Sequence, residues 1–136
     1  MTSHRLADSA IRLTGALTSA GFALLHVAWL LGMGPGTEAP PRHIVSFATY
    51  AALSAFIALG LSRSWAWSSW IAVAFGLLYL VPGLYAFAIT DLWSATSMPL
   101  ARQMLWHFGA ALVLQASTSG AGAVLLIRSR SATSAG

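Results

Sequence analysis

The segment "GFALLHVAWLLGMG" (residues 21–34) decides the fold class. It is almost entirely apolar, and it completes an apolar run that begins near Ile11 and ends at Met33. A helix needs about 20 such residues to cross the hydrocarbon layer of a bilayer. The run therefore predicts a membrane-spanning helix over 11–33, with one ionisable residue, His26, inside the hydrocarbon.

Three further apolar runs follow, at about 44–61, 67–89 and 100–127. Of the 136 residues, 57% are hydrophobic and only 7% are charged, whereas a soluble domain carries about a quarter charged residues. The runs are continuous, while a membrane β-barrel alternates apolar and polar residues. The sequence thus predicts an all-α integral membrane four-helix bundle with short loops. It forms a single domain over 1–136 with a disordered tail at 131–136.

The arginines predict the orientation of this bundle, because positively charged residues concentrate in cytoplasmic loops. All seven basic residues are arginines, and the absence of lysine is a compositional hint of a bacterial source. We expect both termini inside, in a bacterial cytoplasmic (inner) membrane. That topology puts five arginines on the cytoplasmic side and two outside, namely Arg5, Arg12, Arg63, Arg128 and Arg130 against Arg42 and Arg102.

Composition also excludes several kinds of site. There is no cysteine, so disulfides and thiolate metal sites are excluded. The net charge of +4 favours contact with the lipid bilayer and its anionic headgroups, and the arginines form no basic stripe of the kind that binds nucleic acid. The sequence contains no phosphate loop, zinc-protease helix or dinucleotide fingerprint.

Small and polar residues form one stripe on the first run and another on the fourth. Each stripe repeats at steps of three or four residues, which places its members on one helix face. Such faces form buried helix–helix seams in lipid, so the two histidines are expected to face a common interior at similar depth. The stripes are Gly15, Ser19, Phe22 and His26, and His107, Ala111, Gln115, Thr118 and Gly122.

Three other polar or helix-breaking features have structural interpretations. Pro82 and Gly83 in the third run predict a kink, because proline removes a backbone donor from the helix. Gln115 is expected to bridge helices by hydrogen bonds. Asp91 follows the third helix and is expected to pair with Arg102 or Arg42, since a helix C-terminus disfavours an unpaired carboxylate.

Polar and aromatic residues crowd toward the outer ends of the runs. The leading hypothesis is therefore a non-enzymatic membrane protein without a cofactor. Its outward-facing pocket would bind a small lipophilic ligand, or it would dock as an accessory subunit on a larger membrane complex or as a homo-oligomer. The expected pocket residues are His26, Trp29, Tyr85, Trp106 and His107, with Asp91 and Arg102 at the rim.

Three alternatives involve cofactors or catalysis. His26 and His107 could be the axial ligands of a b-type haem, so that the protein carries electrons. His26, His43 and His107 could hold a metal ion. A membrane enzyme could use a histidine with Asp91 or Glu38 to move protons on an isoprenoid or a quinone.

Overall fold

The computed structural model describes the backbone of residues 3–33, 41–89 and 99–133, and the side chains of residues 4–33, 44–85 and 106–131. The described chain is all-α and contains four helices, which confirms the predicted fold class. The helices are α1 (Ser3–Leu30), α2 (Pro41–Ser62), α3 (Ser68–Ile89) and α4 (Pro99–Thr133). Each contains a stretch long and apolar enough to cross a membrane. The protein is therefore a multi-pass membrane protein.

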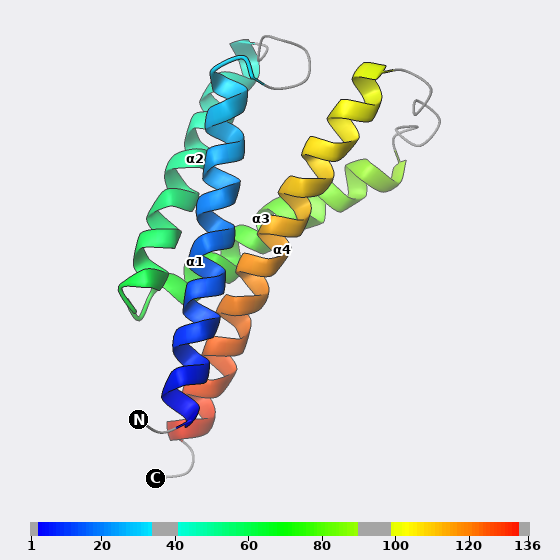
Figure 1. Ribbon diagram of the computed structural model, residues 1–136. Coiled ribbons are helices and arrows are strands. Elements are labelled where there is room, and N and C mark those ends of the chain that lie inside the picture. Colours follow the sequence, from blue (N-terminus) through cyan, green and yellow to red (C-terminus); the bar gives the residue numbers. More distant parts are fainter. Residues whose placement is uncertain (1–2, 34–40, 90–98, 134–136) are drawn as a thin grey trace.

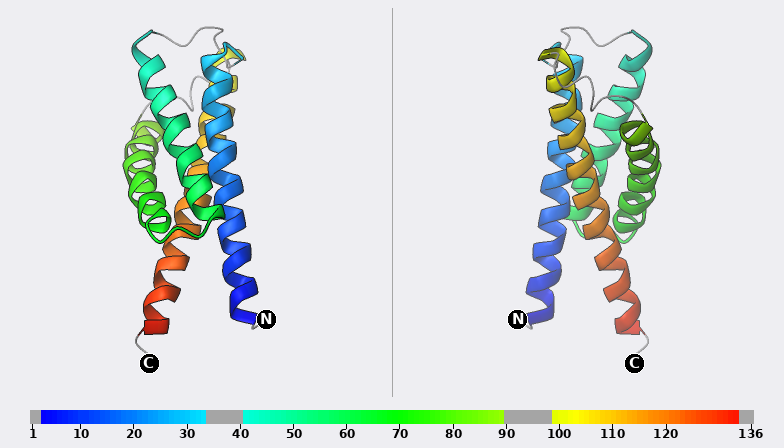
Figure 2. Two further views of the ribbon diagram at one scale, coloured as in Figure 1. Left: turned by 90° about the vertical axis from the view of Figure 1, so that its left-hand side faces the viewer. Right: turned by 90° about the vertical axis from the view of Figure 1, so that its right-hand side faces the viewer.

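Helix α1 packs against both α2 and α4, and α3 packs mainly against α4 (Figure 1). The two chain termini lie at one end of the bundle, which we term the terminal end. At the opposite end, which we term the far end, the α3–α4 pair leans away from the α1–α2 pair. Figure 2 shows that α1 and α4 also run beyond the turn between α2 and α3 at the terminal end.

The expected disordered tail at 131–136 is wrong for residues 131–133, which belong to α4. Helix α1 likewise begins at Ser3, before the apolar run that predicted it. The two extensions lie together, and Arg128 Nε contacts Asp8 Oδ1 at 2.8 Å. This ion pair between the helices gives the polar ends of α1 and α4 a tertiary contact, which the composition of the tail does not reveal.

Small residues let the helices approach closely at the seams. A Cβ atom added at Gly15 would lie 2.9 Å from Ala121 Cβ, and one at Gly76 would lie 2.6 Å from Ser119 Cβ. Both are shorter than an ordinary van der Waals contact, so these positions hold α1 against α4 and α3 against α4. Most members of the predicted stripes are fully buried and His107 is half-buried, which confirms the expected seams.

Several hydroxyl groups within the same seams pair with one another or with the backbone, whereas the buried Ser54 Oγ has no partner among the described residues. Ser19 Oγ donates a hydrogen bond to the Ser54 carbonyl at 2.8 Å, which joins α1 to α2. Thr18 Oγ1 and Thr118 Oγ1 lie 2.9 Å apart and join α1 to α4. In hydrocarbon such bonds contribute about 0.6–2 kcal/mol each, a modest amount because the groups also find partners when the helices are apart.

Helix α2 ends in a left-handed residue that is not glycine. The Trp65 amide donates to the Gly60 carbonyl at 2.9 Å and the Ser64 amide donates to the Leu61 carbonyl at 3.2 Å, with Ser64 at φ 57°. This is the Schellman arrangement, in which glycine is preferred at the left-handed position. At the end of α1, Gly32 takes the corresponding position with φ 72°.

Replacing Gly76 by alanine should destabilise the bundle by about 1–3 kcal/mol, because the added methyl overpacks the α3–α4 seam. Gly120 is the matched control on α4, since a Cβ there meets nothing within 4 Å. Thermal unfolding in detergent should give a lower midpoint for Gly76→Ala and an unchanged or higher midpoint for Gly120→Ala. Equal midpoints for the two variants would contradict the described seam.

Replacing Ser64 by glycine should stabilise the α2–α3 turn by up to about 1 kcal/mol, because glycine adopts positive φ without a steric cost. Ser62→Gly, two residues earlier and still in α2, should lower stability instead, since it weakens the helix and removes the bond from Ser62 Oγ to the Leu59 carbonyl. The unfolding midpoints of the two variants should move in opposite directions. A lower midpoint for Ser64→Gly would argue against the left-handed cap.

Candidate functional site

His26 is a buried imidazole in which one ring nitrogen forms a hydrogen bond and the other forms none with the described side chains. It lies one helical turn before the end of α1 and is 1% exposed. Its Nδ1 lies 2.9 Å from the Phe22 carbonyl oxygen. A carbonyl only accepts, so Nδ1 carries the hydrogen and donates it, which leaves Nε2 of the neutral ring as an acceptor. Within the described side chains, the structure shows no hydrogen bond to Nε2.

Aromatic rings from three helices surround this imidazole. The ring centroid of Phe22 lies 4.3 Å from that of His26, and the other neighbours lie at 5.6–6.2 Å, mostly edge to face. Edge-to-face pairs contribute about 0.5–1.5 kcal/mol each beyond the area that they bury. We term the set the His26 aromatic cluster: Phe22, His26 and Trp29 of α1, Phe47 and Tyr50 of α2, and Tyr79 of α3.

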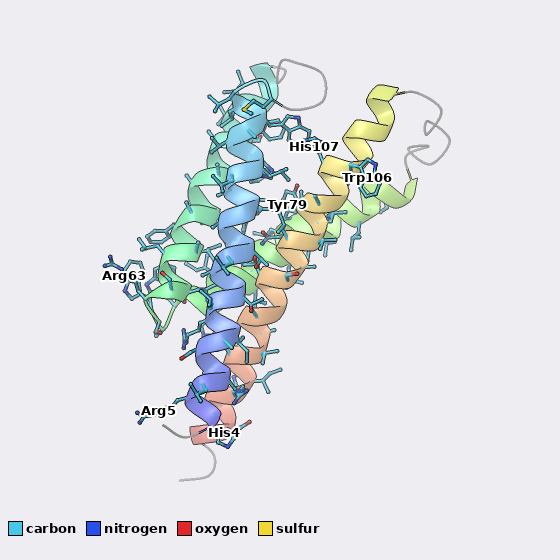
Figure 3. The ribbon with its side chains drawn as sticks, in the orientation of Figure 1. His4, Arg5, Arg63, Tyr79, Trp106 and His107 are labelled. Atoms are coloured by element: carbon cyan, nitrogen blue, oxygen red, sulfur yellow. The ribbon has the colours of Figure 1, made fainter. Side chains whose placement is uncertain are left out.

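Trp29 connects this cluster to α4. Its indole stacks on Phe47 with a centroid distance of 4.8 Å and on His107 with one of 5.9 Å. Figure 3 shows His107 directed from α4 toward α1, with Tyr79 below it between the two helices. The two histidines therefore lie beside the same tryptophan at the far end, as their stripes predicted.

Tyr85 and Trp106 were expected to line the same pocket, and the structure places them elsewhere. They are 66% and 76% exposed, and Figure 3 shows Trp106 on the side of α4 opposite to His107. The reason is helical geometry, since consecutive residues point about 100° apart. Because His107 faces α1, its neighbour Trp106 faces outward. Neither residue is a wall of the cluster.

The expected rim lies outside the described residues. This holds for Asp91 and Glu38, and for the side chains of Arg102, Arg42 and His43. The predicted ion pair of Asp91 and the three-histidine metal site therefore stay predictions. Among the side chains that the structure describes, no three histidine, aspartate or glutamate residues lie close enough together to hold a metal ion.

Three residues that contact His26 were missed in the sequence, namely Phe47, Tyr50 and Tyr79. The same spacing of three or four residues that identified the stripes of α1 and α4 identifies them when it is applied to α2 and α3. On α3, Ser68, Ala72, Phe75 and Tyr79 repeat at steps of four, three and four, and the first three are buried. On α2, Phe47, Tyr50 and Ser54 follow the same rule. A tyrosine on a buried stripe is the signal, whereas Tyr85 attracted attention only through its predicted depth.

Gln115 does not bridge helices as expected. It is 1% exposed, and neither atom of its amide has a hydrogen-bond partner among the described residues. A Cβ added at Gly76 would lie 3.6 Å from Gln115 Nε2, so the amide lies at the seam between α3 and α4. A buried polar group without a partner costs about 1–3 kcal/mol.

The alternative of a b-type haem needs both imidazoles to face the same iron from opposite sides. His26 has its Nε2 open, which suits an axial ligand. However, Trp29 contacts His26 at 6.2 Å and His107 at 5.9 Å between ring centroids. A porphyrin coordinated by both residues would have to displace this indole. The described arrangement of the two rings does not fit a haem held between them.

The contrast between Trp29 and Trp106 can be tested with lipids that carry bromine on their acyl chains, which quench tryptophan fluorescence on contact. Trp106 is exposed on the lipid side of α4, whereas Trp29 is stacked between rings. The quenched fraction should fall in Trp106→Phe and should stay equal or rise in Trp29→Phe. A larger fall in Trp29→Phe would show that Trp29 faces lipid and would contradict the cluster.

Comparisons of the chain with protein families, with curated proteins and with solved structures find no match. No residue role is therefore carried over from another protein. The geometry and chemistry of the His26 aromatic cluster are the grounds on which a function can be argued.

Proposed function

We propose that this protein binds a small lipophilic molecule at the His26 aromatic cluster, in the half of the membrane nearer the far end. One observation carries the proposal. A buried imidazole, with an acceptor nitrogen that has no partner among the described side chains, is surrounded by aromatic rings that include two tyrosines. Ionisable residues inside membrane spans are rare and are associated with function.

The chemistry of the cluster resembles that of small-molecule sites, which combine apolar and aromatic walls with a few polar groups that orient the ligand. Here the walls are rings, and the polar groups are His26 Nε2, the Trp29 indole N–H and the hydroxyls of Tyr50 and Tyr79. These tyrosines, Trp29 and His107 are half-buried, so a molecule at the surface of the bundle reaches them. The divergence of the two helix pairs at this end supports access there (Figure 1).

Binding is favoured over catalysis because of where the charged groups lie. The one carboxylate among the described side chains, Asp8, pairs with Arg128 at the terminal end, far from the cluster. Among the side chains that the structure describes, those at the cluster that could transfer a proton are histidines and tyrosines. The role that we propose is non-enzymatic.

The arginines support the proposed location. The described ones, Arg5, Arg12, Arg63, Arg128 and Arg130, lie toward the terminal end, and Figure 3 labels Arg5 and Arg63 there. By the positive-inside rule this end faces the cytoplasm. The proposed site then lies in the outer half of a bacterial inner membrane, where lipid-soluble molecules have access from the bilayer.

The proposal predicts that a lipophilic compound co-purifies with the protein. Wild type, Trp29→Leu and the exposed control Trp106→Leu would be purified in a mild detergent, extracted with organic solvent and compared by mass spectrometry. We expect one compound at near-stoichiometric amount in wild type and in Trp106→Leu, and at least about tenfold less in Trp29→Leu, because Trp29 forms stacked contacts in the site.

Retention of the compound by Trp29→Leu would place its binding elsewhere. If no compound is enriched over an unrelated membrane protein of similar size, the proposal is wrong. A stoichiometric partner protein in that case would favour the accessory-subunit alternative.

A further inference from the structure

We infer that the ligand of the His26 aromatic cluster is an uncharged lipophilic phenol or hydroquinone, whose hydroxyl donates a hydrogen bond to His26 Nε2. The inference rests on the proposed function and narrows it to one chemical class. It follows from the hydrogen-bonding capacity that the cluster leaves unused and from the positions of the charged side chains that the structure describes.

The Phe22 carbonyl determines which nitrogen of His26 accepts. At 2.9 Å from Nδ1, this oxygen requires the hydrogen to be on Nδ1. The rings of Phe47, Tyr50 and Tyr79 lie around this imidazole, with centroids 5.6, 5.6 and 6.2 Å from its own. Water does not enter hydrocarbon freely, so an acceptor there that finds no partner in the protein or in a ligand remains costly.

The described protein groups around the imidazole provide no such partner for Nε2. The tyrosine rings stand nearly perpendicular to the imidazole, at 85° for Tyr50 and 80° for Tyr79, with centroids 5.6 and 6.2 Å away. Within the described residues neither hydroxyl forms a hydrogen bond with Nε2. A ligand hydroxyl would satisfy the nitrogen, whereas a ketone, an ether or a quinone offers only acceptors and would leave it unpaired.

The charges near the cluster restrict the donor further. A lipophilic acid would bring a carboxylate that needs a cation, and a buried unpaired charge is very costly. The described arginines lie toward the terminal end, so none neutralises an anion at His26. An ionised carboxylate also carries no hydrogen that it could donate to Nε2, which favours an uncharged ligand. Because the walls are aromatic rings in stacked and edge-to-face contact, a flat ring that bears the hydroxyl matches them better than a flexible alcohol does.

The test compares two probes that differ only in the donor: para-dodecylphenol and its methyl ether, para-dodecylanisole. Their affinities for the full-length protein in lipid nanodiscs are obtained from the rise of the unfolding midpoint with probe concentration. In wild type, the phenol should bind about tenfold more tightly than the ether, which is the effect of one satisfied buried hydrogen bond.

Two variants assign this preference to Nε2. His26→Phe keeps the ring without a nitrogen, and His26→Asn keeps a donor for the Phe22 carbonyl but ends before the position of Nε2. In both, the phenol and the ether should bind equally. In Trp106→Phe, at an exposed position, the tenfold preference should persist. If only one of the two His26 variants folds, the ratio of phenol to ether affinity in that variant decides the test.

The outcomes separate the two proposals. Equal binding of phenol and ether to wild type, or a preference that survives in the His26 variants, overturns the donor inference and leaves a lipophilic site in place. If neither probe changes the unfolding midpoint of wild type, the proposed function fails together with the inference.

Discussion

The hydrogen-bond capacity of polar groups inside hydrocarbon is the constraint on which the rest of this structure depends. Where no water competes, each hydroxyl, amide and imidazole must pair within the protein or remain costly. Most of the polar groups comply: Ser19 bonds across to α2, and Thr18 meets Thr118 of α4. Against that background, Nε2 of His26 stands out, together with the amide of Gln115 and the hydroxyl of Ser54, which also have no partner among the described residues.

The seams and the cluster are two consequences of how closely the helices approach. Near the terminal end, glycine and alanine bring α1 within contact of α4, as at Gly15 and Ala121. Toward the far end the residues between the helices become large, and Phe22, Trp29 and Tyr79 occupy the space. The change from small to aromatic side chains agrees with the divergence of the helix pairs seen in Figure 1. It produces the environment in which His26 is held.

The seams were predictable because they rest on periodicity alone. The stripe from Gly15 to His26 is buried as expected, and so is the stripe from His107 to Gly122 except for His107 itself, which is half-buried. The pocket residues were predicted less well, because they were chosen by their depth in the membrane and not by the direction in which each side chain points from its helix. Trp106 and His107 share a depth but point different ways, and only His107 reaches Trp29. Tyr79 was missed because its stripe on α3 was not followed.

Hydropathy and helical periodicity in the sequence by themselves determined the membrane class, the four spans and the buried face of α1 and α4. These properties depend on composition and on spacing along a single helix, so no tertiary information is needed. Only the tertiary structure decided which faces meet. It showed that the Phe22 carbonyl orients His26, that Tyr50 and Tyr79 come from two other helices to surround it, and that Gln115 finds no partner among the described residues. Such pairings depend on the rotation and separation of helices relative to one another, which spacing within one helix does not specify.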